Sequence, residues 1–131
     1  MMSMVRFRTG QGVFLVPTES VLEVRTAAEV KPMPGQKPGV AGLIERNGRA
    51  VTVLTTFGSD GKHVLLFSAG GNSFGLMADE VSGVVSVSDL DIEPAPLGQT
   101  RPLLDGVVKV KTGLELMVSV DALWREIQTS A

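Results

Sequence analysis

The sequence contains no cysteine and no tyrosine, and only one tryptophan and one histidine, in 131 residues. The absence of cysteine fits a reducing compartment and excludes a fold held by disulfides. A chain of this length buries roughly two-thirds of its unfolded surface, so its core needs neither disulfides nor a metal. We therefore expect residues 1–131 to form a single domain.

Long hydrophobic runs are also missing. The longest apolar stretches span only a few residues, whereas a membrane-spanning helix needs about 20. The first residues, Met1–Arg6, lack the basic start and the apolar stretch of a signal peptide. We expect a soluble, cytoplasmic protein that is not inserted in a membrane.

Excess positive charge is absent as well. The chain has 12 basic and 14 acidic residues, a formal net charge of −2, and its five phenylalanines and one tryptophan are scattered. Binding to nucleic acid usually needs a basic surface that neutralises phosphates and aromatic side chains that stack on bases. The composition therefore argues against a nucleic-acid partner.

Groups that would build an active site are scarce. His63 is the only histidine, so a histidine metal site or a catalytic pair of histidines is excluded. Asp79 and Glu80 are adjacent carboxylates, but adjacent strand residues point to opposite faces. The two therefore cannot act on one substrate as a catalytic acid–base pair. The glycine-rich stretch 70–75 lacks the Lys-Ser/Thr ending of a phosphate-binding loop. We predict no enzyme activity, no cofactor and no metal.

Short strands joined by tight turns dominate what is present. Fifteen glycines, seven prolines and many valines favour such an arrangement. Gly83 predicts a bulge, and Asp121 predicts the cap of a terminal helix with Leu123 and Ile127 on one face. Two interpretations of the stretch after Pro17 stay open: Thr18 caps a short helical turn through Ser20, or residues 21–24 simply continue as a strand. No internal repeat is evident. The strands are expected at residues 5–9, 13–16, 21–24, 43–44, 51–54, 63–67, 74–78, 81–87, 107–111 and 114–120.

The segment Val40–Leu54 carries the clearest local signal. Asn47-Gly48 separates two apolar runs and favours a type I′ hairpin turn, which needs positive φ at both central residues. Arg46 and Arg49 flank the turn and give its tip two positive charges. Gly42 precedes the first run, where a missing side chain lets another backbone or a partner approach closely.

The order of these pieces resembles the CheW-like domain, a scaffold family of bacterial chemosensory arrays. The resemblance runs from about Val5 to Leu123. Seven short segments carry it: Phe14–Pro17, Val21–Val24, Met33-Pro34, Val40–Leu54, Phe74–Val84, Ile92–Pro96 and Leu104–Val107.

The resemblance implies an all-β fold of two intertwined, small SH3-like β-barrels with a short C-terminal helix. The single domain would have its core at about residues 5–127 and would be made of two barrel subdomains. Members of the family have no catalytic activity. They connect the cytoplasmic tip of a chemoreceptor to the regulatory domain of a CheA-type histidine kinase.

The resemblance also implies two sets of contact residues. Val21, Gly42 and Asn47 fall where the family contacts the receptor, and Arg46 and Arg49 flank that turn. Glu23 and Val24 lie near the kinase contact. The resemblance implies that a groove between the barrels receives the receptor helix and that barrel edges meet the kinase domain.

The chain departs from the family pattern at a few positions. Asn47 takes the place of the arginine in the family's Leu-Arg-Gly turn, Thr52 replaces a proline, and Thr55 and Ser119 each replace an aspartate. These departures leave an alternative open, in which the module serves a different signalling partner. A small β-barrel enzyme or ligand-binding protein is a third interpretation, and it lacks the required acid, base and nucleophile.

Overall fold

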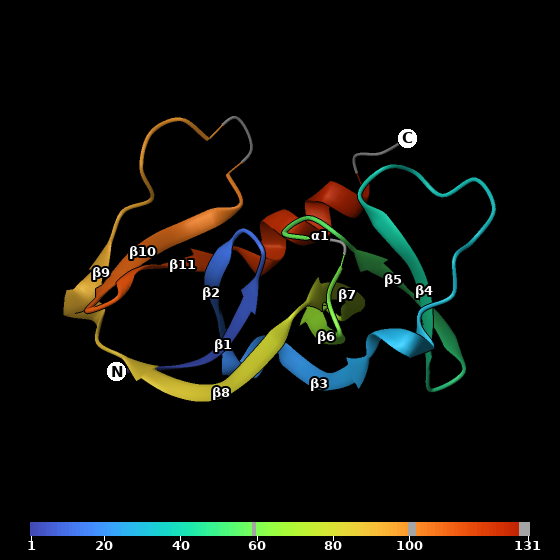
Figure 1. Ribbon diagram of the computed structural model, residues 1–131, viewed down its shortest axis with the longest axis horizontal. Helices are drawn as coiled ribbons and strands as arrows, with labels where there is room; N and C mark the ends of the chain where they lie inside the picture. Colours follow the sequence, from blue (N-terminus) through green and yellow to red (C-terminus); the bar gives the residue numbers. More distant parts are fainter. Residues whose placement is uncertain (59, 100–101, 129–131) are drawn as a thin grey trace.

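Two β-sheets and one short C-terminal helix make up the fold in the computed structural model (Figure 1). The structure describes residues 1–58, 60–99 and 102–128. Three short 3-10 helices, Thr18–Ser20, Ala27–Glu29 and Asp89–Asp91, connect strands. The elements in chain order are β1 (Met2–Thr9), β2 (Gly12–Pro17), β3 (Val21–Thr26), β4 (Val40–Arg46), β5 (Arg49–Leu54), β6 (His63–Ala69), β7 (Asn72–Ala78), β8 (Glu80–Val87), β9 (Ile92–Glu93), β10 (Leu104–Val110), β11 (Gly113–Val118) and α1 (Val120–Gln128).

The chain passes between the sheets, so each sheet contains strands from both halves of the sequence. The first barrel has the strand order β8-β1-β2-β11-β10-β9, and the second barrel has the order β3-β6-β7-β5-β4. After the β1–β2 hairpin the chain enters the second barrel as β3, and after the β6–β7 hairpin it returns to the first as β8. This exchange intertwines the barrels and confirms the all-β prediction.

Three apolar clusters fill the interior. One cluster is internal to the first barrel and includes Met4, Leu15 and Met117. A second is internal to the second barrel and includes Ile44, Val53 and Leu66. The largest, the shared cluster, lies between the barrels, and α1 packs on it; it includes Phe7, Phe14, Phe57, Leu65, Phe67, Phe74 and Leu123. Strands such as β6 are buried on both faces, which explains their continuous hydrophobic runs.

The two barrels are built on one repeated plan, which the sequence analysis missed. The strand order β8-β1-β2-β11-β10 in the first barrel corresponds to β3-β6-β7-β5-β4 in the second. In both barrels the four successive pairings are antiparallel, antiparallel, parallel and antiparallel. Phe7–Phe14 and Phe67–Phe74 occupy equivalent cross-strand positions, and the ring centroids of each pair are 5.4 Å apart. The expectation of no internal repeat is therefore wrong at the level of structure.

The hairpins β4–β5 and β10–β11 repeat in the same way. Gly42 pairs with Val53, Gly106 pairs with Met117, and each pairing follows a register shift at the start of the hairpin. The tips of the two hairpins lie at opposite ends of the long axis of the molecule (Figure 1). Positions in the two hairpins can therefore be compared one by one.

Most local expectations are confirmed, and two caps are wrong. Thr18–Ser20 forms a 3-10 turn that leads into strand β3, which confirms the helical turn, but Pro17 holds the N-cap position and Thr18 does not cap it. The pairing of β1 with β8 shifts register next to Gly83, as a bulge requires. Ser119, rather than Asp121, caps α1, because its Oγ accepts a hydrogen bond from the Ala122 N–H at 3.2 Å.

Candidate functional site

The β4–β5 hairpin closes in the tight turn that its sequence predicts. Asn47 and Gly48 have φ values of 52° and 79°, the positive angles of a type I′ turn. The Gly48 N–H donates a hydrogen bond to Glu45 Oε1 at 2.8 Å, which fixes the tip. Arg46 and Arg49 are directly paired across the two strands. The turn therefore carries two arginines at facing positions of its two strands.

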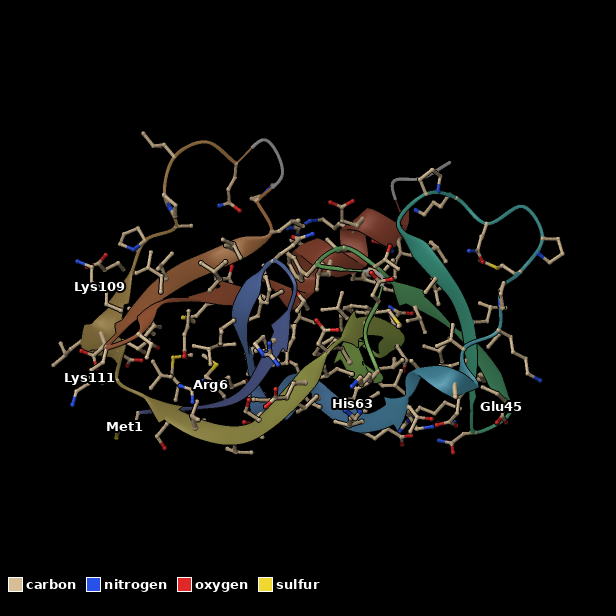
Figure 2. All side chains as sticks on the ribbon, in the orientation of Figure 1. Met1, Arg6, Glu45, His63, Lys109 and Lys111 are labelled. Atoms are coloured by element: carbon tan, nitrogen blue, oxygen red, sulfur yellow. The ribbon has the colours of Figure 1, made fainter. Side chains whose placement is uncertain are left out.

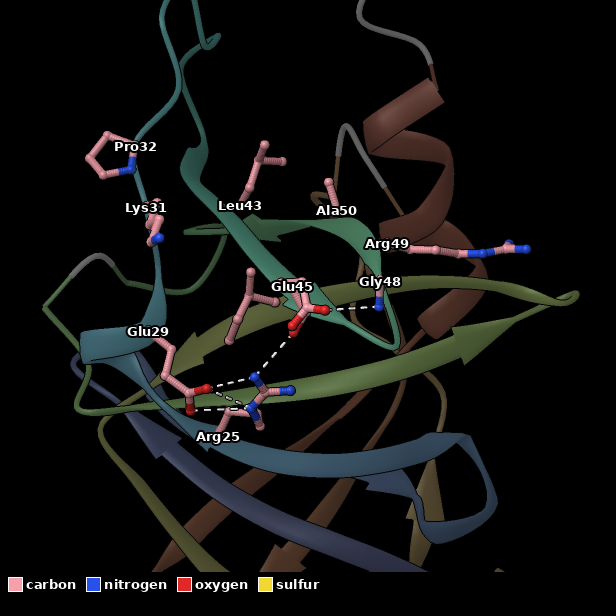
Figure 3. Close-up of a pocket in the computed structure, with 10 residues that line it drawn as sticks. Arg25, Glu29, Lys31, Pro32, Leu43, Glu45, Gly48, Arg49 and Ala50 are labelled. Atoms are coloured by element: carbon pink, nitrogen blue, oxygen red, sulfur yellow. Dashed lines mark hydrogen bonds and ion pairs between the residues drawn. The ribbon is translucent and has the colours of Figure 1, made fainter.

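Charged side chains from β3, from the 3-10 turn Ala27–Glu29 and from β4 join beside this turn in an ionic cluster of Glu23, Arg25, Glu29 and Arg46. Arg25 Nη1 lies 2.8 Å from Glu23 Oε1, and Arg25 Nη2 lies 2.6 Å from Glu29 Oε1. Arg46 Nε lies 3.5 Å from Glu23 Oε2. Arg25 Nη2 also donates to the backbone oxygen of Glu45 at 3.1 Å, which ties β3 to the hairpin (Figure 3).

The cluster shifts the acidity of its members. The hydrogen bond from Arg25 lowers the pKa of Glu23 and, together with the Thr26 backbone N–H, the pKa of Glu29. The same carboxylates raise the pKa of Arg25, with Glu29 contributing most. All three groups therefore carry full charge at neutral pH.

Gly42 is required by close packing within the chain. A Cβ at this position would overlap the carbonyl oxygen of Lys31, and its φ of 149° disfavours other residues. Lys31 and Leu43 exchange two backbone hydrogen bonds of 2.8 Å each. The sequence predicts a close approach at Gly42, and the structure identifies the approaching group as the chain's own backbone.

Two pockets lie against the hairpin. The hairpin groove, of about 580 Å³, is lined by Arg25, Glu29, Pro32, Leu43 and Ala50 among others (Figure 3). The arginine pocket, of about 370 Å³, is lined by Arg46, Asn47, Arg49, Asn72, Ser73 and Trp124 among others. The hairpin is thus flanked by an apolar groove with charged edges and by a polar pocket.

The structure brings some of the predicted contact residues together and separates others. Glu23 and Arg46, assigned to different partners, are neighbours in the ionic cluster. Val24 is 45% exposed and points away from Glu23, because neighbouring strand residues alternate. Val21 is half-buried and packs on the shared cluster. Gly42 is buried against the backbone of Lys31 and Pro32.

Sequence reasoning missed Arg25, Glu29 and Trp124. The spacing Glu23-x-Arg25 places two opposite charges on one face of a strand, and this signal was available in the sequence. The approach of Glu29 depends on the 3-10 turn Ala27–Glu29, and that of Trp124 depends on how α1 docks. Neither of these two arrangements follows from periodicity.

A cluster of metal ligands is not found among the described residues. No group of three or more histidine, cysteine, aspartate or glutamate side chains is placed to hold a metal within ranges 1–58, 60–99 and 102–128. His63 begins strand β6 and pairs with Thr26 and Ala78 (Figure 2 labels it). Across the same ranges, no helix is both long and apolar enough to cross a membrane.

Comparison with known proteins assigns the architecture to a family. The model of the CheW-like domain matches residues 3–128, nearly the whole chain. The chain belongs to the CheW-like domain family. Members of this family are non-catalytic adaptors, in agreement with the expectation from the sequence.

Individual relatives agree with this assignment. The chain is 26% identical to "Chemotaxis protein CheW" of Rhizobium meliloti (strain 1021), over 92% of this chain and 86% of that protein. It is 24% identical to "Probable chemotaxis protein CheW" of Rhizobium etli, over 98% of this chain and 90% of that protein. These matches make this CheW-like chain similar to chemotaxis proteins along most of its length.

A solved structure supports the fold. The scaffolding protein TtCheW from Thermoanaerobacter tengcongensis superposes with a TM-score of 0.80 at 20% identity, covering 91% of this chain and 84% of that one. The predicted pair of SH3-like barrels is thereby confirmed for this CheW-like protein.

Proposed function

We propose that this CheW-like protein is an adaptor that couples a chemoreceptor to a CheA-type histidine kinase, without chemistry of its own. One observation carries the proposal beyond family membership. Glu23, expected at the kinase contact, and Arg46, beside the expected receptor contact, lie 3.5 Å apart in one ionic cluster. A surface on which the two contact sets meet suits a protein that holds two partners next to each other.

The hairpin supplies the shape such a surface needs. A receptor tip is a helical hairpin, and a helix binds where an apolar groove is edged by polar anchors. The hairpin groove offers Pro32, Leu43 and Ala50 beside the paired charges of Arg25 and Glu29. We propose that the receptor contacts this hairpin and that the kinase regulatory domain contacts β3 through Glu23 and Val24.

The place of action follows from these partners. Chemoreceptor tips lie on the cytoplasmic side of the membrane, so we propose that the protein works in the cytoplasm at receptor arrays. Its own chain provides the barrels and the hairpin, and the receptors would provide the attachment to the membrane.

A direct binding experiment tests the proposal. The purified protein is mixed with a CheA-type regulatory domain and with a receptor tip fragment, and complexes are detected by size-exclusion chromatography and calorimetry. We expect Arg46→Ala to weaken binding by roughly tenfold, because it removes a charge from the contact surface. Lys111→Ala, at the tip of the opposite hairpin, should bind as the wild type does. Folded protein that binds neither partner would refute the adaptor function.

A second candidate is a CheW-like module that serves another signalling partner. Asn47, in place of the family's arginine, is the observation that favours it. Its φ of 52° is a conformation that asparagine tolerates well and arginine less well. Asn47→Arg should strengthen receptor binding if the receptor contact is retained in weakened form. An unchanged affinity would favour the different partner.

A further inference from the structure

We propose that the arginine pocket receives the carboxylate of an acidic side chain on the bound receptor segment. The proposal rests on the proposed function, since that function supplies the partner. It adds the chemistry of the contact and assigns Arg49 and Trp124 to it.

The walls of the pocket are complementary to a negative charge. Arg46 and Arg49 provide two guanidinium groups, and Asn47, Asn72 and Ser73 provide further donors. Trp124 adds an aromatic wall, and no acidic side chain is among the described residues that line the pocket. Arginine pairs with the two oxygens of a carboxylate through a planar fork of donors.

The two arginines also lack full compensation inside the protein. They face each other as a cross-strand pair, and like charges in that position repel. Arg46 approaches Glu23 through Nε at 3.5 Å, yet this buried Nε makes no hydrogen bond with any described residue. Arg49 is exposed and has no ion pair within the part of the chain that the structure describes. An incoming carboxylate would relieve this repulsion.

The fold does not require these charges. In the repeated hairpin β10–β11, the cross-strand pair at the same place is Val110 and Gly113. The arginine pair is thus a property of the β4–β5 hairpin alone. Trp124 reaches the pocket from α1, where its ring centroid lies 6.1 Å from that of Phe74. A low-polarity wall of this kind strengthens an ion pair formed beside it.

The first test uses a matched pair of charge reversals, Arg49→Glu and Lys111→Glu. Both residues are exposed, both lie at a hairpin tip, and both substitutions change the net charge equally. We expect Arg49→Glu to weaken binding of the receptor tip fragment by roughly tenfold or more and Lys111→Glu to change it less than about twofold. One acidic-to-amide substitution in the fragment should reproduce the loss, with no further loss when combined with Arg49→Glu. Unchanged binding by Arg49→Glu would overturn the proposal while leaving the adaptor function intact.

The second test does not depend on the receptor. Sodium propionate, which mimics a glutamate side chain, is titrated at constant ionic strength against labelled protein, with propionamide as the neutral control. We expect saturable shifts of the Trp124 indole N–H and the Arg49 Nε–H resonances with propionate alone, retained in Lys111→Glu and lost in Arg49→Glu. Equal shifts with propionamide, or no shift at these groups, would overturn the proposal. A positive result with no receptor binding would refute the proposed partner but retain the carboxylate site.

Discussion

The two barrels share one strand register but place their charges at different positions. Inside the first barrel, Arg6 Nη2 lies 2.8 Å from Glu115 Oε1, and the Glu115 side chain is only 9% exposed. The equivalent positions in the second barrel are Leu66 and Val51, which belong to its internal apolar cluster. An ion pair and an apolar contact thus fill the same space in the repeated plan.

At the edges of the barrels the difference is reversed: the second barrel has charged residues where the first has apolar ones. Arg25 and Arg46 of the ionic cluster correspond to Val85 and Val110 in the first barrel, where both valines pack on the internal cluster. Because valines satisfy these positions, the fold does not need charges there. The comparison supports the proposal that the ionic cluster serves recognition, whereas Arg6 pairs with Glu115 inside the first barrel (Figure 2 labels Arg6).

The shared cluster connects the barrels despite these differences. Phe7 and Phe14 from the first barrel and Phe67 and Phe74 from the second lie in it together with α1. Neither barrel can unfold without exposing this apolar surface. We propose that residues 1–131 form one domain, with the core at about residues 5–127, and we expect a single unfolding transition.

Gly42 and Gly106 provide the largest expected difference between the barrels. Gly42→Ala would drive a Cβ into the Lys31 backbone at a positive φ, whereas a Cβ at Gly106 would lie 2.9 Å from the Glu93 oxygen without that strain. We expect losses in the free energy of unfolding of about 3–4 kcal/mol for Gly42→Ala and about 1–2 kcal/mol for Gly106→Ala. Urea unfolding measures both. Equal losses would show that the two close approaches are equivalent.

The Arg6–Glu115 pair gives the next largest effect. Arg6→Leu leaves the buried Glu115 carboxylate without its partner and should cost about 3 kcal/mol in the free energy of unfolding. The double variant Arg6→Leu/Glu115→Val copies the second barrel and should recover to within about 1 kcal/mol of the wild type. A double variant as unstable as the single one would mean that the barrels are not interchangeable at these positions.

Ser119 and Thr55 are equivalent residues with different tasks. Their backbone N–H groups donate to Leu103 and Gly39 respectively, each at 2.8 Å, but a helix follows only Ser119. Ser119→Ala should therefore cost about 1 kcal/mol, the usual value of an N-cap. Thr55→Ala should cost less than about 0.5 kcal/mol. Thermal unfolding measures both changes, and equal values would contradict the capping role of Ser119.

The sequence predicts the strands and the β4–β5 turn well because those features depend on local chemistry. Alternation fixes which strand face is buried, and Asn47-Gly48 alone determines the turn type. The cap of α1 was misassigned because Ser119 and Asp121 are both good cap residues. The choice between them depends on where β11 ends, because that point sets the first residue of α1.

The ionic cluster and the arginine pocket could be predicted only in part. Arg46 and Arg49 follow from the turn, but Arg25 reaches the hairpin because β3 crosses into the second barrel. The internal repeat cannot be predicted from the sequence, because the two barrels share their strand register but not their residue types, as with Val110 and Arg46. Chain crossing and register are tertiary properties, so they become visible only in the folded structure.

Substitutions in the ionic cluster should have the smallest effect on the free energy of unfolding, but they should clearly change the pKa of its glutamates. Glu23 and Glu29 have a lowered pKa in the folded protein, chiefly because Arg25 donates to both carboxylates. Their contribution to stability is therefore complete above the ordinary value of 4.5 and is lost as the pH falls through the lowered pKa. Arg25→Gln should raise the pKa of both glutamates, as NMR titration of their carboxyl carbons would show.

Arg8→Gln provides the matched control for this titration. Arg8 Nη2 lies 2.6 Å from Glu80 Oε2, an exposed pair in the first barrel away from the cluster. Arg8→Gln should leave the pKa of Glu23 and Glu29 unchanged, because salt screens the electrostatic effect of exposed charges beyond short distances. If Arg8→Gln shifted these carboxyls as much as Arg25→Gln does, the lowered pKa values would reflect the overall charge of the protein. If only Arg25→Gln raised the pKa of Glu23 and Glu29, the lowered pKa values would come from the local contacts beside the β4–β5 hairpin. Those contacts would then be the charge difference between the two barrels.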